Sequence, residues 1–113
     1  MDFQKANLNE FGLSENSMAI INGIYSKFPQ IEKVICYGSR AMGTFREGSD
    51  IDMTIVADGD FSHEDLLDIA GLFDDSMLPY LVDVSDFSKL KNADLIDHIN
   101  RRGKILYQRK NDL

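Results

Sequence analysis

The sequence is short of basic residues. Its 113 residues include 12 Lys and Arg against 19 Asp and Glu, which gives a formal net charge of −7. A protein that binds nucleic acid by itself normally presents a cluster of basic residues, and the sequence has none. This composition argues against a polymerase acting on nucleic acid. The negative charge fits either a basic protein partner or solubility alone.

Cysteine and long apolar runs are also scarce. The single cysteine, Cys36, excludes an internal disulfide and suits a reducing cytoplasm; we expect it to be a small buried hydrophobe. No run approaches the roughly 18 apolar residues of a membrane span, and no signal-peptide pattern is present at the start. We therefore expect a cytoplasmic protein with one domain over residues 1–113, and 43% hydrophobic residues suffice for a core.

The most informative stretch runs from Val34 to Val56 and reads V-I-C-Y-G-S-R-A-M-G-T-F-R-E-G-S-D-I-D-M-T-I-V. Its second strand-like run begins with Asp50 and Asp52. Alternate residues of a strand share a face, so these carboxylates should lie about 6–7 Å apart. Two such carboxylates repel each other unless a cation lies between them. Together with substrate phosphates they indicate a magnesium site.

A Gly-Ser pair closes the first apolar run of this stretch. Gly38 allows a sharp turn and the close approach of a ligand. If Ser39 to Met42 begin a short helix, its first amides are unpaired and favour an anion. Ser39 adds a hydroxyl and Arg40 a guanidinium to the same end. A phosphate-binding turn opposite a carboxylate-bound metal is the apparatus for nucleotidyl transfer.

These residues resemble the signature of the polymerase-β-like nucleotidyltransferase superfamily. The match is Gly38-Ser39, ten further residues, and then Asp50-Ile51-Asp52. The fuller text G-S-R-A-x-G-x-x-x-x-x-S-D-I-D is similar to the minimal nucleotidyltransferases. The resemblance implies an α/β (α+β) nucleotidyltransferase fold, with a small mixed sheet of about three to four strands flanked by helices. The chain departs from many relatives at Met42, where they have a second arginine; we expect weaker phosphate binding or altered partner contacts.

The resemblance also implies a third carboxylate. Asp83 interrupts an apolar run at 80–84, which looks like the family's third metal-binding strand. Asp86 is the alternative, but it fits a loop or a helix cap better. The implied site has two Mg²⁺ ions and ATP as the nucleotide donor. Its metal and catalytic residues are Asp50, Asp52 and Asp83, and its nucleotide-binding residues are Gly38, Ser39, Arg40 and Ser49.

Periodicity predicts the remaining elements. Apolar spacing indicates helices over 15–27, 63–73 and 94–102, and strands over 33–37, 51–56 and 80–84 with an edge segment at 104–107. We expect Ser14 or Asn16 and Ser62 to cap helices, and Pro29 and Gly103 to end them. The first two strands are linked too tightly for a parallel crossover. We expect His63 at the surface, His98 packed in the core, an irregular or partly helical arm before residue 15, and a polar tail over 108–113.

Similar stand-alone domains are encoded beside HEPN-type RNase toxins and act as antitoxins by adenylylating a toxin tyrosine. The resemblance therefore implies AMP transfer from ATP to such a partner in a hetero-oligomer, without direct nucleic-acid or membrane contact. Two alternatives stay open. One is a small-molecule (aminoglycoside-like) nucleotidyltransferase, although such enzymes generally have an additional domain. The other is a non-catalytic antitoxin that masks its partner by binding.

Overall fold

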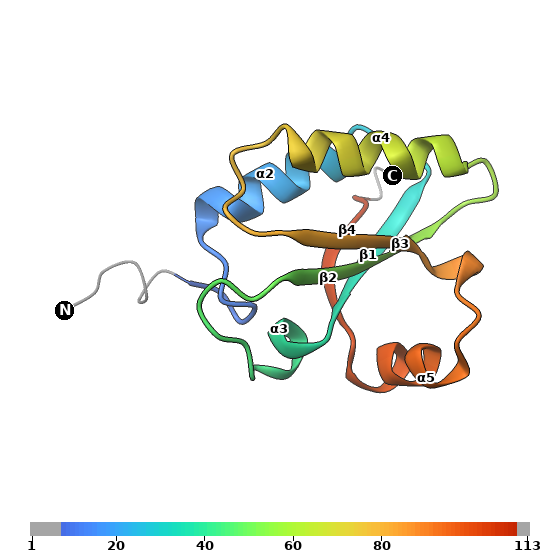
Figure 1. Ribbon diagram of the computed structural model, residues 1–113. Coiled ribbons are helices and arrows are strands. Elements are labelled where there is room, and N and C mark those ends of the chain that lie inside the picture. Colours follow the sequence, from blue (N-terminus) through green and yellow to red (C-terminus); the bar gives the residue numbers. More distant parts are fainter. Residues whose placement is uncertain (1–7, 111–113) are drawn as a thin grey trace.

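Four strands form one mixed sheet in the computed structural model, which describes residues 8–110 (Figure 1). Strand β1 (Ile31–Tyr37) pairs antiparallel with both β2 (Ile51–Ala57) and β4 (Lys104–Gln108). Strand β3 (Val82–Asp86) pairs parallel with β2, so the strand order is β3-β2-β1-β4. The predicted mixed sheet and the antiparallel pairing of the first two strands are both confirmed, and β4 is an edge strand as expected.

Helices cover both faces of this sheet (Figure 1). Helices α2 (Glu15–Tyr25) and α4 (His63–Asp74) lie together on one face. The short helix α3 (Ser39–Met42) and helix α5 (Ala93–Arg102) lie on the other, and a 3₁₀ turn, η1 (Phe87–Lys89), follows β3. Within residues 8–110, no helix is both long and apolar enough to cross a membrane.

Alternation along β2 separates the core from the opposite face. Ile51, Met53 and Ile55 are fully buried. They lie on the face covered by α2 and α4, where the Tyr25 hydroxyl donates to the Met53 sulfur at 3.3 Å. Because successive strand residues point to opposite faces, Asp52 is directed to the face of α3 and α5. Burying one face of β2 thus places the carboxylate on the other.

Local capping chemistry explains most helix boundaries. The Ser14 and Ser62 hydroxyls accept from backbone amides at the starts of α2 and α4, as predicted. Helix α2 ends at Tyr25, before the predicted Lys27, because the next residues form a tight turn ahead of Pro29. The predicted N-terminal arm and polar tail lie partly outside the described residues.

The third strand was predicted two residues too early. It spans Val82–Asp86 rather than 80–84, because its pairing with β2 begins at Val82, opposite Ile51. Tyr80 instead packs its ring against the Arg40 guanidinium, 4.4 Å away. The shift leaves Asp83 near the start of the strand.

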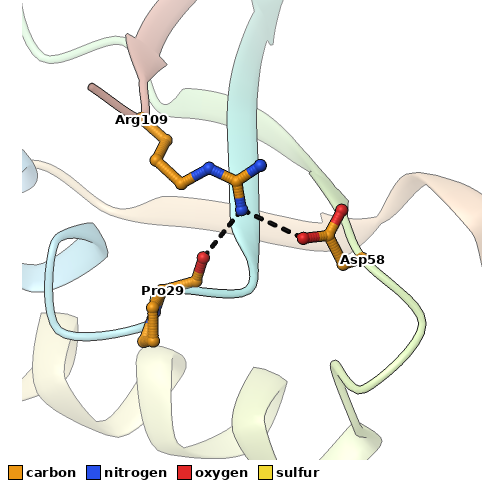
Figure 2. Close-up of polar contacts among 3 residues, drawn as sticks. All are labelled: Pro29, Asp58 and Arg109. Carbon is orange, nitrogen blue, oxygen red and sulfur yellow. Dashed lines mark hydrogen bonds and ion pairs between the residues drawn. The ribbon is translucent and has the colours of Figure 1, made fainter. Parts of the chain in front are cut away.

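Polar contacts of Arg109 fix the end of the sheet remote from Asp52. Its Nη1 donates to the Pro29 carbonyl at 2.8 Å and to Asp58 Oδ2 at 3.0 Å (Figure 2). Its backbone amide donates to the Glu32 carbonyl at 2.8 Å. These contacts join the segment after β4 to the turns that precede β1 and follow β2.

Candidate active site

Strand register sets three polar side chains in one row across the sheet. Tyr37 of β1 is opposite Asp52 of β2, and Asp52 is opposite Asp83 of β3. Asp50 directly precedes β2 and is exposed. Residues paired across a sheet share a face, so the row brings the side chains of Asp52 and Asp83 together. The predicted carboxylates therefore gather where β1 ends and where β2 and β3 begin.

The electrostatics of this row show the crowding of negative charge. Burial raises the pKa of Asp52 above its ordinary value, and the carboxylates of Asp83 and Asp50 raise it further. Burial also raises the pKa of the Tyr37 phenol, with Asp83 and Asp52 adding to the effect. A cation would relieve this repulsion, and carboxylate oxygens are the donors that Mg²⁺ prefers.

The carboxylates do not by themselves enclose a metal. Among residues 8–110, no group of three His, Cys, Asp or Glu side chains is arranged to hold a metal ion. Mg²⁺ does not need such an arrangement, because it commonly binds to one or two carboxylates plus substrate phosphates. The donor set around Asp52 therefore fits Mg²⁺ bound together with a nucleotide.

A glycine turn lies directly against Asp52. Gly38 has φ 77° and ψ −154°, and a Cβ there would lie 2.6 Å from Asp52 Oδ2. Its carbonyl accepts from the amides of Ala41 and Met42 at 3.2 and 3.1 Å. The preceding amides, those of Ser39 and Arg40, have no acceptor within the described residues. We call Gly38–Arg40 the phosphate turn, since it presents two unpaired amide donors beside a carboxylate.

The structure gives the Arg40 side chain a structural position instead of the predicted place at the nucleotide. The residue is only 2% exposed. Its Nε and Nη2 donate to the Ser49 carbonyl at 3.0 and 2.8 Å, and its Nη1 donates to the Phe11 carbonyl at 2.9 Å. The guanidinium also lies 5.2 Å from the Phe45 ring. These contacts join the segment before α2 to the loop before Asp50.

Ser49 and Met42 complete the connection between α3 and β2. The Ser49 hydroxyl accepts from the Arg46 amide at 2.8 Å, so this predicted nucleotide-binding residue holds the loop that delivers Asp50. Met42, in place of the second arginine of many relatives, is 47% exposed.

Asp83 and Asp86 occupy different environments in the structure. Asp83 is exposed and aligned with Asp52. Asp86 Oδ1 accepts from the backbone amide and hydroxyl of Ser88 at 3.0 and 2.7 Å, capping η1 as its sequence context predicts. Of the two residues, only Asp83 pairs with Asp52 in the row, and its role as the third carboxylate stays a prediction. Cys36 is fully buried, and burial raises the pKa of its thiol to about 12, as suits a structural residue.

One neighbour of the phosphate turn had no local sequence signal. His98, on α5, accepts the Gly38 amide on Nε2 at 3.3 Å. We expected this histidine in the core, but it is only half-buried. Its ring packs edge to face on Tyr37. The other histidine, His63, is exposed, as predicted.

The carboxylates stand on an open surface. Asp50 and Asp83 are exposed, and three hollows on the surface of the described residues are lined by residues other than Asp50, Asp52 and Asp83. Leu81, whose carbonyl accepts the Ile51 amide beside the row, is 75% exposed. Leu81 therefore presents an exposed apolar side chain just before the strand that carries Asp83.

Comparison with known proteins identifies the family of this chain. Residues 20–112 match the family model described as polymerase beta, nucleotidyltransferase. The chain belongs to this family. It is 33% identical over 95 residues to a provisionally named protein adenylyltransferase of Methanocaldococcus jannaschii, covering 77% of this chain and 90% of that protein. The predicted family and enzyme class, nucleotidyltransferase, are thereby confirmed.

Solved structures of toxin–antitoxin complexes share the fold of this nucleotidyltransferase. A chain of a complex with AMP-PNP matches with a TM-score of 0.66 and 22% identity, over 82% of this chain and 74% of that chain. A chain of a complex between a tri-AMPylated HEPN toxin of Shewanella oneidensis and an MNT antitoxin matches with a TM-score of 0.60 and 18% identity, over 84% and 72%. A mutant MntA–HpeT complex gives 0.64 and 26%, over 87% and 75%. The predicted nucleotidyltransferase fold is confirmed.

Proposed function

We propose that this nucleotidyltransferase moves AMP from ATP to a tyrosine of a HEPN-type toxin and so acts as its antitoxin. The observation that supports this most directly is the contact between the phosphate turn and Asp52, which puts unpaired amide donors beside aligned carboxylates. The name of the Methanocaldococcus jannaschii relative, a protein adenylyltransferase, supports the reaction. The AMPylated HEPN toxin bound to an MNT antitoxin supports the acceptor and the partner.

The phosphate turn would hold the triphosphate of the donor. The Ser39 and Arg40 amides and the Ser39 hydroxyl would donate to phosphate oxygens. Because Gly38 has no side chain, the Asp52 carboxylate can lie against the phosphate turn. Mg²⁺, two ions by expectation, would bind Asp50, Asp52 and Asp83 with the triphosphate, neutralise charge and activate the acceptor hydroxyl.

In the transfer step, the tyrosine oxygen would attack the α-phosphorus of ATP. A bond forms between that oxygen and the phosphorus, while the bond from the α-phosphorus to its bridging oxygen breaks and pyrophosphate leaves. Asp83 would lie nearest the acceptor and help to accept the phenolic proton, since it is exposed and next to Asp52 in the row. The protein thus orients the reactants and stabilises charge, with no covalent intermediate of its own.

An open site favours a macromolecular acceptor. Small-molecule sites are usually concave and cover most of their ligand, whereas Asp50 and Asp83 are exposed. Exposed Leu81, two residues before Asp83, would give a protein partner an apolar contact near the acids. The net charge of −7 would attract a basic partner.

The test is intact-mass spectrometry of a HEPN-type toxin encoded beside this protein, after incubation with the protein, ATP and Mg²⁺. Mass added in AMP units, and lost with Asp50→Ala combined with Asp52→Ala, would support the proposal. A matched control combines Asp74→Ala with Asp75→Ala, which removes two exposed carboxylates at the end of α4 and should keep activity.

The remaining outcomes separate the alternatives. A stable complex without added mass, formed equally by the native and Asp50→Ala/Asp52→Ala proteins, would indicate an antitoxin that only masks its partner. The absence of both added mass and a stable complex would favour a small-molecule acceptor. Either result would overturn the proposed protein transfer.

A further inference from the structure

Helix α5 is fixed against the end of β1. Ile99, on its inner side, is 2% exposed. Gly103, which follows the helix, lies so close to Ile35 of β1 and to the Ile99 carbonyl that a side chain there has no room. The backbone around His98 is therefore held in a defined place relative to the strand that leads into the phosphate turn.

From this position on α5, His98 contacts the phosphate turn, although the two are 60 residues apart in the sequence. Its Nε2 accepts the Gly38 amide at 3.3 Å. Its ring lies edge to face on Tyr37, with centroids 6.3 Å apart and an interplanar angle of 81°. An imidazole that accepts on Nε2 is neutral and has its proton on Nδ1. The contact thus defines both the orientation of the ring and its tautomer.

We propose that His98 is a positioning residue for nucleotide binding, acting through the Gly38 amide. Gly38 is the N-cap of α3 but has no side chain to form a capping hydrogen bond. Glycine also has the greatest backbone freedom of all residues, so the Gly38 peptide needs another contact to fix its orientation. The acceptor on His98 fixes the peptide between Tyr37 and Gly38. That peptide sets the direction of the following Ser39 and Arg40 amides. The inference rests on the proposed placement of the triphosphate at the phosphate turn.

The same hydrogen bond occupies the Gly38 amide and leaves the next two amides of the turn, those of Ser39 and Arg40, free to bind phosphate. Since the Gly38 amide is paired with His98, the donors left for phosphate begin at Ser39. Without the acceptor on His98, the Gly38 amide would turn toward water or toward the anion itself. Either rotation moves the next two amides off their direction and weakens nucleotide binding.

The first test measures binding of the ATP analogue AMP-PNP, with Mg²⁺, by calorimetry. His98→Leu removes the acceptor, and we expect affinity to fall about tenfold, in line with the loss of a hydrogen bond to a partly buried amide. His98→Gln supplies an acceptor oxygen on a side chain of similar reach and should bind within about threefold of native. His63→Leu changes the other histidine, exposed on α4, and should bind as native.

Thermal melting of the variants identifies loss of affinity that comes from unfolding. At temperatures where both variants are folded, equal affinity of His98→Leu and native protein would overturn the proposal. So would a His98→Gln affinity as low as that of His98→Leu, because packing of the ring on Tyr37 would then be what matters.

Nitrogen NMR of the nucleotide-free native protein tests the hydrogen bond itself. We expect His98 to be neutral with its proton on Nδ1; a proton on Nε2 would refute the contact. The outcomes also separate this inference from the proposed function. Native protein that fails to bind AMP-PNP would refute the placement of the nucleotide, whereas native binding unaffected by His98→Leu would refute the positioning role alone.

Discussion

The carboxylate of Asp52 occupies the space that a side chain on Gly38 would need, with only 2.6 Å between Oδ2 and the position of a Cβ. One residue ends the first strand of the motif and the other begins the second, so the contact joins the two halves of the G-S…D-x-D pattern. The turn therefore needs glycine at position 38 for two reasons: Asp52 leaves no room for a side chain, and φ is 77°, a value that other residues rarely adopt.

Gly38→Ala should therefore abolish transfer as well as reduce stability. The added methyl would displace the Asp52 carboxylate, and the backbone strain should cost about 1–3 kcal/mol in free energy of unfolding. Gly43→Ala is the matched control, because Gly43 also has φ 77° but a Cβ there would meet nothing within 4 Å. It should lose about 1–2 kcal/mol yet keep transfer within a few-fold. Urea unfolding and AMP transfer measure the two effects, and equal activity in the two variants would contradict this account.

At neutral pH, Asp52→Asn should lower the rate of AMP transfer and raise the free energy of unfolding. The raised pKa of Asp52 means that the folded state binds a proton more readily than the unfolded chain. Stability from this group is therefore present at acid pH and is lost as the pH rises from the ordinary carboxyl range through the raised pKa. We expect the variant, without Mg²⁺, to gain stability relative to native as the pH rises. Transfer should fall about 10²–10³-fold.

The check is a series of urea unfolding curves from acid to neutral pH for native, Asp52→Asn and Asp60→Asn proteins. Asp60 is an exposed carboxylate in the turn before α4. A pH-dependent gain should appear for Asp52→Asn and not for Asp60→Asn. A neutral-pH loss of stability in Asp52→Asn would show that its carboxylate is favourably paired.

Arg40→Lys should destabilise the fold by about 3 kcal/mol, since hydrogen bonds to buried charged groups contribute about 1.5–3 kcal/mol each. Lysine cannot reproduce the planar fork that donates to Ser49 and Phe11 or the packing on Tyr80. Arg46→Lys, in the same connection but exposed, should change the free energy of unfolding by less than about 0.5 kcal/mol. Denaturant unfolding decides, and similar values for the two variants would refute the structural role of Arg40.

Alanine at positions 83 and 86 should separate the two candidates for the third carboxylate. Asp83→Ala should lower the rate of AMP transfer about 10²–10³-fold with little effect on stability, because the side chain is exposed beside Asp52. Asp86→Ala should keep transfer within a few-fold and lose about 1 kcal/mol with the cap of η1. Single-turnover assays and urea unfolding measure these effects. A large loss of transfer in Asp86→Ala, with transfer nearly unchanged in Asp83→Ala, would identify Asp86 as the third carboxylate instead.

Much of the fold follows from local patterns. Ser62 caps α4 because its hydroxyl is next to the amides that need an acceptor, and alternation along β2 directs Asp52 away from the core; both depend only on near neighbours. The third strand was misplaced because its limits depend on where β2 offers a partner, a non-local matter that the apolar run at 80–84 does not contain.

The sequence by itself determined the Gly38 turn, the Asp50–Asp52 pair and the link between the first two strands that is too tight for a parallel crossover, since all three depend on spacing along one short stretch; the mixed sheet followed from the family resemblance. Only the tertiary structure decided how distant parts complete the site. Arg40 is buried because carbonyls and rings from separate segments surround it. His98 reaches Gly38 because α5 packs on β1. Spacing determines what neighbouring residues can do, whereas contacts across 29 or 60 positions exist only once the core has formed.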